Sequence, residues 1–160
     1  MRVGVNIFIT SYTIGIVPLA QQLEKLGFES LFVPEHPVMP VKRRVAWPGG
    51  GELPDWYKRT IDPFVGLMAA ATATKKLRVG TGICLVPQRH PLIMAKQVAT
   101  LDYLSGGRFE FGVGAGWMLD EMELFGADIK HPWANAKDFV LAMKEMWTKD
   151  EASYNGKYVK

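Results

Sequence analysis

The sequence TLDYLSGGRFEFGVGAGW, residues 100–117, decides the fold that we expect for this chain. The SGG at residues 105–107 predicts the end of a helix, because glycine reaches the left-handed conformation at little steric cost. The apolar run over residues 109–113 has the length of a buried β-strand. Glycine then recurs at every second position, at Gly112, Gly114 and Gly116. One face of the predicted strand exit therefore carries no side chains.

This glycine pattern has two interpretations that the residues alone leave open. A dinucleotide-binding fingerprint is excluded, because its third glycine would fall at Trp117 and no acidic residue follows at the required distance. The glycines either permit close packing inside a barrel or let a flat ligand approach the backbone.

Predicted strands alternate with predicted helices along the whole chain. Strands are expected over residues 3–9, 30–33, 77–86 and 109–113, from their apolar patterns. Helices are expected over residues 16–26, 63–76, 91–105 and 139–147. Asp62 before Pro63 is a typical helix start, and Asn155-Gly156 indicates a hairpin. The alternation predicts an α/β fold, either an open parallel sheet or a β/α barrel.

One connection is unusually long. Residues 35–60 are rich in proline and glycine and contain Trp47, Trp56 and Tyr57. Long connections without regular structure are uncommon unless they are functional or disordered, and the aromatic residues argue against disorder. We expect this connection to cover a site.

Composition argues against several classes of protein. The chain of 160 residues fits a single domain over residues 1–160, and its net charge of +3 is too small to indicate a nucleic-acid partner. The basic run at residues 42–44 is expected to be a solvated surface. The single Cys84 excludes an internal disulfide and is expected to be a buried, inert thiol, and three scattered histidines offer no metal site. With no apolar run of membrane-spanning length and no signal peptide, a cytoplasmic protein is expected.

Three linked motifs resemble the central signature of the bacterial luciferase-like oxidoreductases. They are AKQVATLD at residues 95–102, LSGGR at residues 104–108 and GVGAGW at residues 112–117. That family contains flavin-dependent monooxygenases and enzymes that use the deazaflavin coenzyme F-420. The resemblance implies a TIM-barrel type of (β/α) fold, of which this chain supplies only the first four β/α units, a half-barrel. A complete barrel needs eight strands and usually about 250 residues.

A half-barrel has consequences for partners. Its outer strands are unpaired and the inner face is uncovered, so we expect a fragment, a homo-oligomer or assembly with a missing C-terminal half. The phosphate-binding loops of such barrels usually follow strands seven and eight, and would therefore lie beyond residue 160.

Polar residues directly after the predicted strands are the candidate catalytic groups, because functional groups of a β/α barrel gather at the C-terminal strand ends. His36 follows the second strand, and an imidazole exchanges protons near neutral pH. A loop histidine hydrogen-bonded to the backbone is the alternative. The VPEH sequence at residues 33–36 resembles the acidic-His motif of the deazaflavin-dependent members. This implies that His36 lies beside the cofactor ring and that Glu35 fixes it.

The resemblance also implies cofactor contacts from two other strand ends. GTGI at residues 80–83 resembles the strand in which the deazaflavin branch of the family has a bulge with a non-proline cis peptide bond. The resemblance implies that this bond is Gly82–Ile83 in this chain. An ordinary strand glycine is the alternative. The expected cofactor-binding residues are His36, Gly82, Ile83, Cys84, Gly114, Ala115, Gly116 and Trp117.

Other positions depart from the family pattern or are given a structural role. Trp117 stands where some members carry an acidic residue that acts on substrate, so that role is not transferred to this chain. The acids nearby, Asp120, Glu121 and Glu123, are expected to be solvated on an early helix turn. Asp102 and Arg108 are expected to bracket the glycine turn structurally.

The expected function is hydride transfer between coenzyme F-420 and a small organic substrate. A monooxygenase using reduced FMN and oxygen is the first alternative. A catalytically silent half that completes a barrel with a partner is the second. Neither a nucleic acid nor a membrane is expected as a partner.

Overall fold

The computed structural model describes all 160 residues, which form two compact units. The first unit comprises residues 1–39, 53–84 and 100–113, and the second comprises residues 40–52, 85–99 and 114–160. Each unit is therefore assembled from segments that are distant in the sequence. None of the helices combines the length and the apolar character that crossing a bilayer would require.

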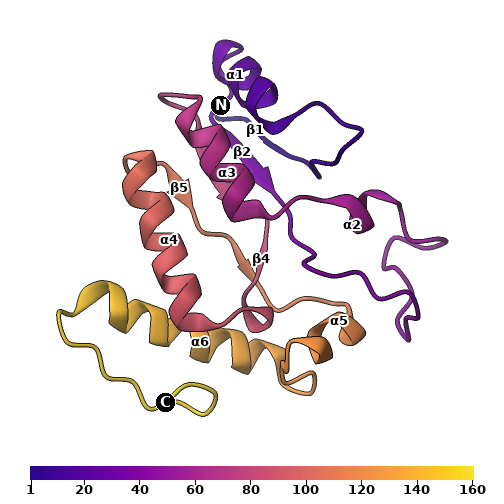
Figure 1. Cartoon of the computed structure of the whole chain (residues 1–160), viewed down its shortest axis with the longest axis vertical. Helices are drawn as coiled ribbons and strands as arrows, with labels where there is room; N and C mark the ends of the chain where they lie inside the picture. The colour runs from indigo at the N-terminus through magenta and orange to yellow at the C-terminus, as the bar shows by residue number, and fades with distance from the viewer. The chain divides into compact units, whose positions relative to one another are not determined.

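A four-stranded parallel sheet forms the centre of the first unit (Figure 1). Its strands lie in the order β1 (Gly4–Asn6), β2 (Ser30–Val33), β3 (Arg78–Thr81) and β5 (Phe109–Glu110). Since every neighbouring pair is parallel, the carboxyl ends of the strands meet at one edge. This α/β half-barrel confirms the predicted fold class. β1 and β5 pair on one side only in this sheet, and the predicted assembly with a further half or copy stays a prediction.

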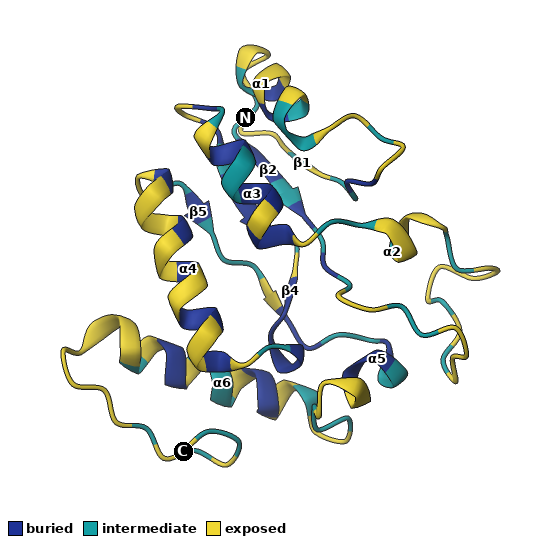
Figure 2. Cartoon of the chain, viewed as in Figure 1, coloured by how far each residue is buried: buried dark blue, intermediate teal, exposed yellow.

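Helices α1 (Ile16–Lys25) and α3 (Pro63–Thr72) supply the apolar cover of this sheet. α3 begins as the sequence predicts, because the Asp62 carboxylate accepts a hydrogen bond of 3.0 Å from the Val65 N–H and Pro63 is the first helical residue. α3 contacts both α1 and β3, and most of its residues are buried (Figure 2). The core residues of this unit include Ala20, Leu23, Leu31, Val33, Leu67, Ala70, Leu77 and Val79.

Arg108 joins three segments of the first unit. Its guanidinium donates four hydrogen bonds of 2.6 to 3.1 Å, to the carbonyl oxygens of Ala71, Leu77 and Ser105 and to the Thr74 hydroxyl. The Asp102 carbonyl accepts from the Gly107 N–H, which closes the glycine turn. The structural role predicted for this pair is confirmed, although Asp102 contributes its backbone to the turn.

Helix α6 (Pro132–Thr148) is the longest element of the second unit, and it contacts the short 3-10 helix η1 (Val86–Gln88). It begins seven residues before the predicted apolar face. The Trp147 indole N–H donates to the Ala95 carbonyl at 3.0 Å. The buried apolar residues of this unit include Met94, Met118, Met122, Ala142 and Met143.

Four further elements complete the chain. α2 (Trp56–Arg59) lies within the long connection, and α4 (Pro91–Ser105) ends at the predicted glycine turn. α5 is Leu119–Leu124, and a separate two-stranded sheet pairs β4 (Cys84–Leu85) with β6 (Val113–Gly114).

Several local predictions were wrong. The strands expected over residues 77–86 and 109–113 each break in two: residues 82–83 separate β3 from β4, and residues 111–112 separate β5 from β6. Val86 lies outside the strand, in the 3-10 turn η1. No strands flank Asn155-Gly156; the Gly156 N–H donates to the Val159 carbonyl at 2.8 Å and closes a turn.

The charges near α5 also differ from the prediction. Glu121 is completely buried. Asp120 and Glu123 form ion pairs of 2.7 and 2.5 Å with Arg44, which belongs to the basic run that we expected to be a solvated surface. The Arg44 backbone N–H also donates a hydrogen bond of 2.9 Å to the Asp120 carboxylate. These carboxylates therefore anchor the segment around Arg44, a contact that no local pattern reveals.

Candidate functional site

The candidate site of the first unit lies where the ends of β1, β2 and β3 meet. The strands are joined just beyond their ends: the Gly82 N–H donates to the Val33 carbonyl at 2.9 Å, and the Asn6 side-chain amide donates to the Gly82 carbonyl at 3.2 Å. His36 follows β2 and Gly82 follows β3. The parallel register thus brings the predicted residues of two strands to one edge of the sheet.

A small aromatic cluster lies on one side of the imidazole of His36. The His36 ring lies 5.0 Å from the Tyr57 ring, centroid to centroid, and the planes are inclined by 58°. Tyr57 in turn lies 4.8 Å from the Phe8 ring. Tyr57 belongs to α2, in the long connection that we expected to cover a site. The imidazole is therefore half-buried beside the Tyr57 ring, which is itself supported by Phe8, and this contact restricts its orientation.

A small cavity of about 150 Å³ adjoins His36. Its lining includes Glu35, Thr60 and Asp62. Glu35 is only 2% exposed, and the buried Thr60 hydroxyl has no hydrogen-bond partner. Small-molecule sites usually have volumes of about 300–1,000 Å³. This cavity thus has room for a small polar group and cannot by itself enclose a tricyclic ring.

The backbone after β3 has the geometry that the family resemblance implied. The Gly82–Ile83 peptide bond is cis, which confirms that prediction. A Cβ on Gly82 would lie 3.0 Å from the Asn6 amide and from Phe32. The Ile83 side chain is 41% exposed at this edge. A side chain at residue 82 would therefore crowd Asn6 and Phe32, while Ile83 presents an apolar surface.

Cys84 is completely buried, as predicted for an inert thiol. Its backbone N–H donates to the Gly112 carbonyl at 2.8 Å. A contact between Cys84 and a cofactor stays a prediction.

Two of the alternating glycines are explained by local packing. A Cβ on Gly112 would lie 2.2 Å from the Thr81 carbonyl oxygen, and the Thr81 hydroxyl donates to the Gly112 carbonyl at 2.7 Å. In the second unit, Gly116 has a φ of +89°, and a Cβ there would lie 3.2 Å from the Gln88 amide nitrogen. The packing interpretation accounts for both residues without a ligand.

The remaining predicted cofactor residues belong to the second unit. Ala115 is 2% exposed and Gly114 is buried, whereas Trp117 is half-buried. Their proposed contact with a cofactor stays a prediction.

Three contributors to the site were not singled out from the sequence: Asn6, Tyr57 and Thr60. Asn6 is the one polar side chain among Gly4, Asn6 and Phe8, which alternate with the aliphatic residues of this segment, and this is a signal that could have indicated its role. In the sequence, Tyr57 is one of three aromatic residues of the long connection, and nothing near Thr60 distinguishes it.

No group of three or more His, Cys, Asp or Glu side chains is placed to hold a metal ion. Parallel β/α units are the repeating units of a TIM barrel, a fold in which functional groups lie at the carboxyl ends of the strands. The sequence profile described as luciferase-like monooxygenase matches residues 6–160, and the chain belongs to that family.

The similar curated proteins include a monooxygenase and an F420-dependent dehydrogenase. The chain is 39% identical to the uncharacterized protein Rv0953c of Mycobacterium tuberculosis, covering all of this chain and 58% of that protein. It is 36% identical to the 4-hydroxyprotoasukamycin monooxygenase of Streptomyces nodosus subsp. asukaensis, over 69% of this chain and 25% of the relative. It is 29% identical to the F420-dependent glucose-6-phosphate dehydrogenase of Amycolatopsis mediterranei, over 89% of this chain and 40% of the relative.

Solved structures support the same fold. The monooxygenase RslO1 from Streptomyces bottropensis superposes with a TM-score of 0.80 at 25% identity, over 99% of this chain and 46% of that one. The coenzyme F420-dependent tetrahydromethanopterin reductase from Methanopyrus kandleri gives a TM-score of 0.73 at 25% identity, over 99% and 44%. The chain thus spans about half the length of the proteins it resembles.

Proposed function

We propose that this chain supplies the N-terminal half of the active site of an oxidoreductase that uses coenzyme F-420 and acts on a small organic substrate. The observation that carries the proposal is the position of His36, held by Tyr57 at the shared strand edge. Two proteins described as F420-dependent, the dehydrogenase from Amycolatopsis and the reductase from Methanopyrus, support the choice of cofactor.

The residues at this edge have the chemical character that the ring of a flavin or deazaflavin would contact. Ile83 offers an exposed apolar surface, and His36 offers a group that donates or accepts a hydrogen bond. The cavity beside His36 admits only part of such a ring, so the rest would lie outside it. When bound, F-420 supplies the hydride chemistry.

The tasks of this chain's own residues are positioning, water exclusion and proton handling. Tyr57 packs beside the imidazole and keeps water from one of its sides, and Phe8 packs against Tyr57. The Nδ1 or Nε2 atom of His36 would hold a proton next to the reacting atoms. The buried Glu35, adjacent in sequence, would fix the position of His36 as a positioning residue.

A monooxygenase that uses reduced FMN and oxygen is the second candidate. The observation that favours it is the similarity to two proteins described as monooxygenases, from Streptomyces nodosus subsp. asukaensis and Streptomyces bottropensis. Titration with F-420 and with FMN, followed by absorbance and fluorescence, separates the two candidates. Saturable binding of FMN with no binding of F-420 would overturn the first proposal.

A half that is silent until a partner completes the barrel is the third candidate, favoured by the one-sided pairing of β1 and β5. Stable association with a C-terminal half, or with a second copy, and no cofactor binding before that association would support it.

Replacing His36 by alanine tests the lead proposal. We expect turnover to fall by about 100-fold or more, because general acid–base groups typically contribute 10²–10⁴-fold. His131→Ala is the matched control, since that imidazole is exposed on the second unit and pairs with Asp128. Unchanged turnover in His36→Ala with cofactor still bound would remove His36 from the mechanism.

A further inference from the structure

One of the three asparagines of the chain has a neighbour that makes its side-chain amide reactive. Asn155 is followed by Gly156, whereas Asn6 and Asn135 are followed by residues that carry a side chain. Because glycine has no Cβ, its backbone nitrogen approaches the side-chain carbonyl carbon of a preceding asparagine with little hindrance. Asn155 is also exposed to solvent. These features favour deamidation at Asn155.

Deamidation of this kind needs no enzyme and no cofactor. The Gly156 nitrogen loses its proton and forms a bond to Cγ of Asn155, and the bond from Cγ to the side-chain nitrogen breaks, which releases ammonia. Water then opens the succinimide ring at either carbonyl, and the products are aspartate and isoaspartate. Each converted chain gains one negative charge at neutral pH. The reaction therefore begins only where the Gly156 N–H is free.

In the folded chain the Gly156 N–H is engaged in a hydrogen bond. It donates to the Val159 carbonyl at 2.8 Å and closes a turn. Deprotonation of this nitrogen therefore requires the turn to open, as the hydrogen exchange of a bonded amide does. A Cβ on Gly156 would lie 2.2 Å from Asp138 Oδ1, so a side chain there would displace the Asp138 carboxylate. The packing that favours glycine at this position is thus also what leaves Asn155 reactive.

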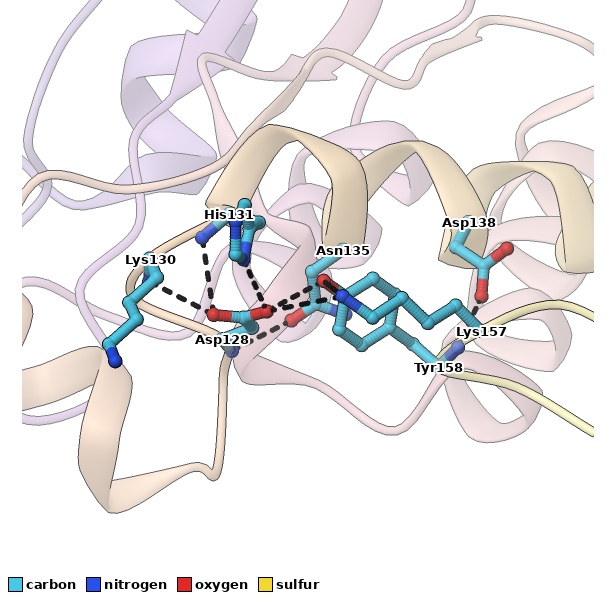
Figure 3. A network of polar contacts seen from close by, with 7 residues as sticks. All are labelled: Asp128, Lys130, His131, Asn135, Asp138, Lys157 and Tyr158. Atoms are coloured by element: carbon cyan, nitrogen blue, oxygen red, sulfur yellow. Dashed lines mark hydrogen bonds and ion pairs between the residues drawn. The ribbon is translucent and has the colours of Figure 1, made fainter.

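Residues 154–159, which we call the strap, are held against helix α6 by the Asp138 carboxylate (Figure 3). Asp138 accepts hydrogen bonds of 2.6 Å from the Tyr154 hydroxyl and from the Tyr158 N–H. It accepts a third, of 3.2 Å, from the Val159 N–H. Since these bonds join both sides of the turn to one carboxylate, Asp138 opposes the opening that deamidation requires.

Asp128 adds a fourth contact, because it accepts a hydrogen bond of 2.7 Å from the Tyr158 hydroxyl. This bond is the main cause that holds the pKa of Asp128 below its usual range. Burial raises the pKa of Asp138, but the hydrogen bonds from the strap outweigh it, so this pKa is also lowered. Asp138 in turn raises the pKa of Tyr154 to about 12. At neutral pH the acceptors are therefore charged and the tyrosine is a donor, which gives strong hydrogen bonds.

We propose that Asn155 is a site of spontaneous deamidation whose rate is set by the opening of the strap. While the strap is docked, the Gly156 nitrogen is unavailable and Asn155 persists. The product carries an added negative charge in a segment that two carboxylates hold, so repulsion weakens its docking. Conversion is thus a one-way switch toward the open strap.

Opening of the strap also changes a cavity of about 420 Å³ in the second unit, because Tyr158 and Val159 are part of its lining. The switch therefore acts on the accessibility of that cavity. This inference concerns the second unit alone and does not depend on the proposed function.

Peptide mapping by mass spectrometry of the full chain, incubated at mildly alkaline pH, tests the proposal. The measurement distinguishes asparagine, aspartate and isoaspartate at residue 155. We expect conversion of Asn155 to be at least about tenfold faster in guanidinium chloride, which unfolds the strap, than in buffer. Asn6 and Asn135 are internal references and should convert more slowly than Asn155 in the denaturant. Equal rates for Asn155 in both solutions, or no conversion in the denaturant, would overturn the proposal.

Asp138→Ala removes the acceptor of three strap hydrogen bonds, and we expect Asn155 of the folded variant to convert at least about tenfold faster than in the wild type. Asp120→Ala is the matched control, since this carboxylate of the same unit pairs with Arg44, and it should convert like the wild type. Tyr158→Phe removes only the bond to Asp128 and should give a smaller acceleration. Unchanged conversion in both strap variants would contradict the role of the strap.

Hydrogen exchange of the Gly156 amide, followed by ¹H–¹⁵N spectra, is an independent measurement of the same opening. In Asp138→Ala it should accelerate by the same factor as deamidation, because both reactions need the bond to Val159 to break. Asn155→Asp reproduces the charge of one product and should also raise the exchange rate. Faster deamidation of Asp138→Ala without faster exchange would refute control by the strap, and unchanged exchange in Asn155→Asp would refute the switch.

Discussion

Replacing Arg108 by methionine is the sharpest test of what holds the first unit together. The guanidinium bridges α3, the start of β3 and the end of α4 through four hydrogen bonds of 2.6 to 3.1 Å. Methionine keeps much of the apolar stem and removes all four donors. Three carbonyl oxygens and the Thr74 hydroxyl would then lose a partner.

The magnitude follows from the number and environment of these bonds. Each is worth about 0.5–1.5 kcal/mol net, and the charge of the donor raises this value, whereas partial exposure lets water replace some of the loss. We therefore expect the free energy of unfolding to fall by about 2–4 kcal/mol. For a chain of this size, that corresponds to a decrease in Tm of roughly 5–15 °C.

Urea denaturation and thermal unfolding, both followed by circular dichroism, measure the effect. Arg108→Lys should lie between the wild type and Arg108→Met, because an ammonium group keeps the charge and cannot reach all four acceptors. Arg2→Met is the matched control: its side chain is 85% exposed and forms a single ion pair of 3.0 Å with Glu29, so we expect a change within about 0.5 kcal/mol. If Arg108→Met is no more destabilising than Arg2→Met, the bridging role assigned to Arg108 is wrong.

Two further changes test other parts of the first unit. Gly112→Ala should lower the free energy of unfolding, measured by urea denaturation, by about 1–3 kcal/mol, because the new Cβ would lie 2.2 Å from the Thr81 carbonyl oxygen. Gly15→Ala is the control, since a Cβ there makes only ordinary contacts at 3.5 Å or more. Equal effects of the two substitutions would contradict the packing explanation. Burial raises the pKa of Glu24, but hydrogen bonds from the backbone of residues 75–77 outweigh it, so the pKa lies below the usual 4.5. This carboxylate therefore stabilises the fold fully above about pH 4.5 and loses that contribution as the pH falls through the lowered pKa. Glu24→Gln should destabilise the protein at pH 7 by about 1–2 kcal/mol, and the difference from the wild type should shrink as the pH falls below about 4.5. A pH-independent difference between Glu24→Gln and the wild type would contradict this assignment.

The candidate site could be predicted only in part. His36 and the Gly82–Ile83 bond were placed correctly at strand ends, because motif resemblance and strand order fix where such residues lie. Tyr57 beside His36 and the Asn6 contact with Gly82 could not be predicted, since they join segments that are distant in the sequence. The alternating glycines show the same limit: only the neighbours of Gly112 reveal why it has no side chain.

The sequence by itself determined the order of strands and helices, the start of α3 at Asp62-Pro63, the end of α4 at the glycine turn and the family. These features follow from caps, periodicity and turns, whose causes act within a few residues. The tertiary structure alone decided that the two long strands break, that Glu121 is buried and that Arg44 pairs with Asp120. Burial and ion pairing depend on which distant segments come into contact, and a local sequence pattern does not determine those contacts.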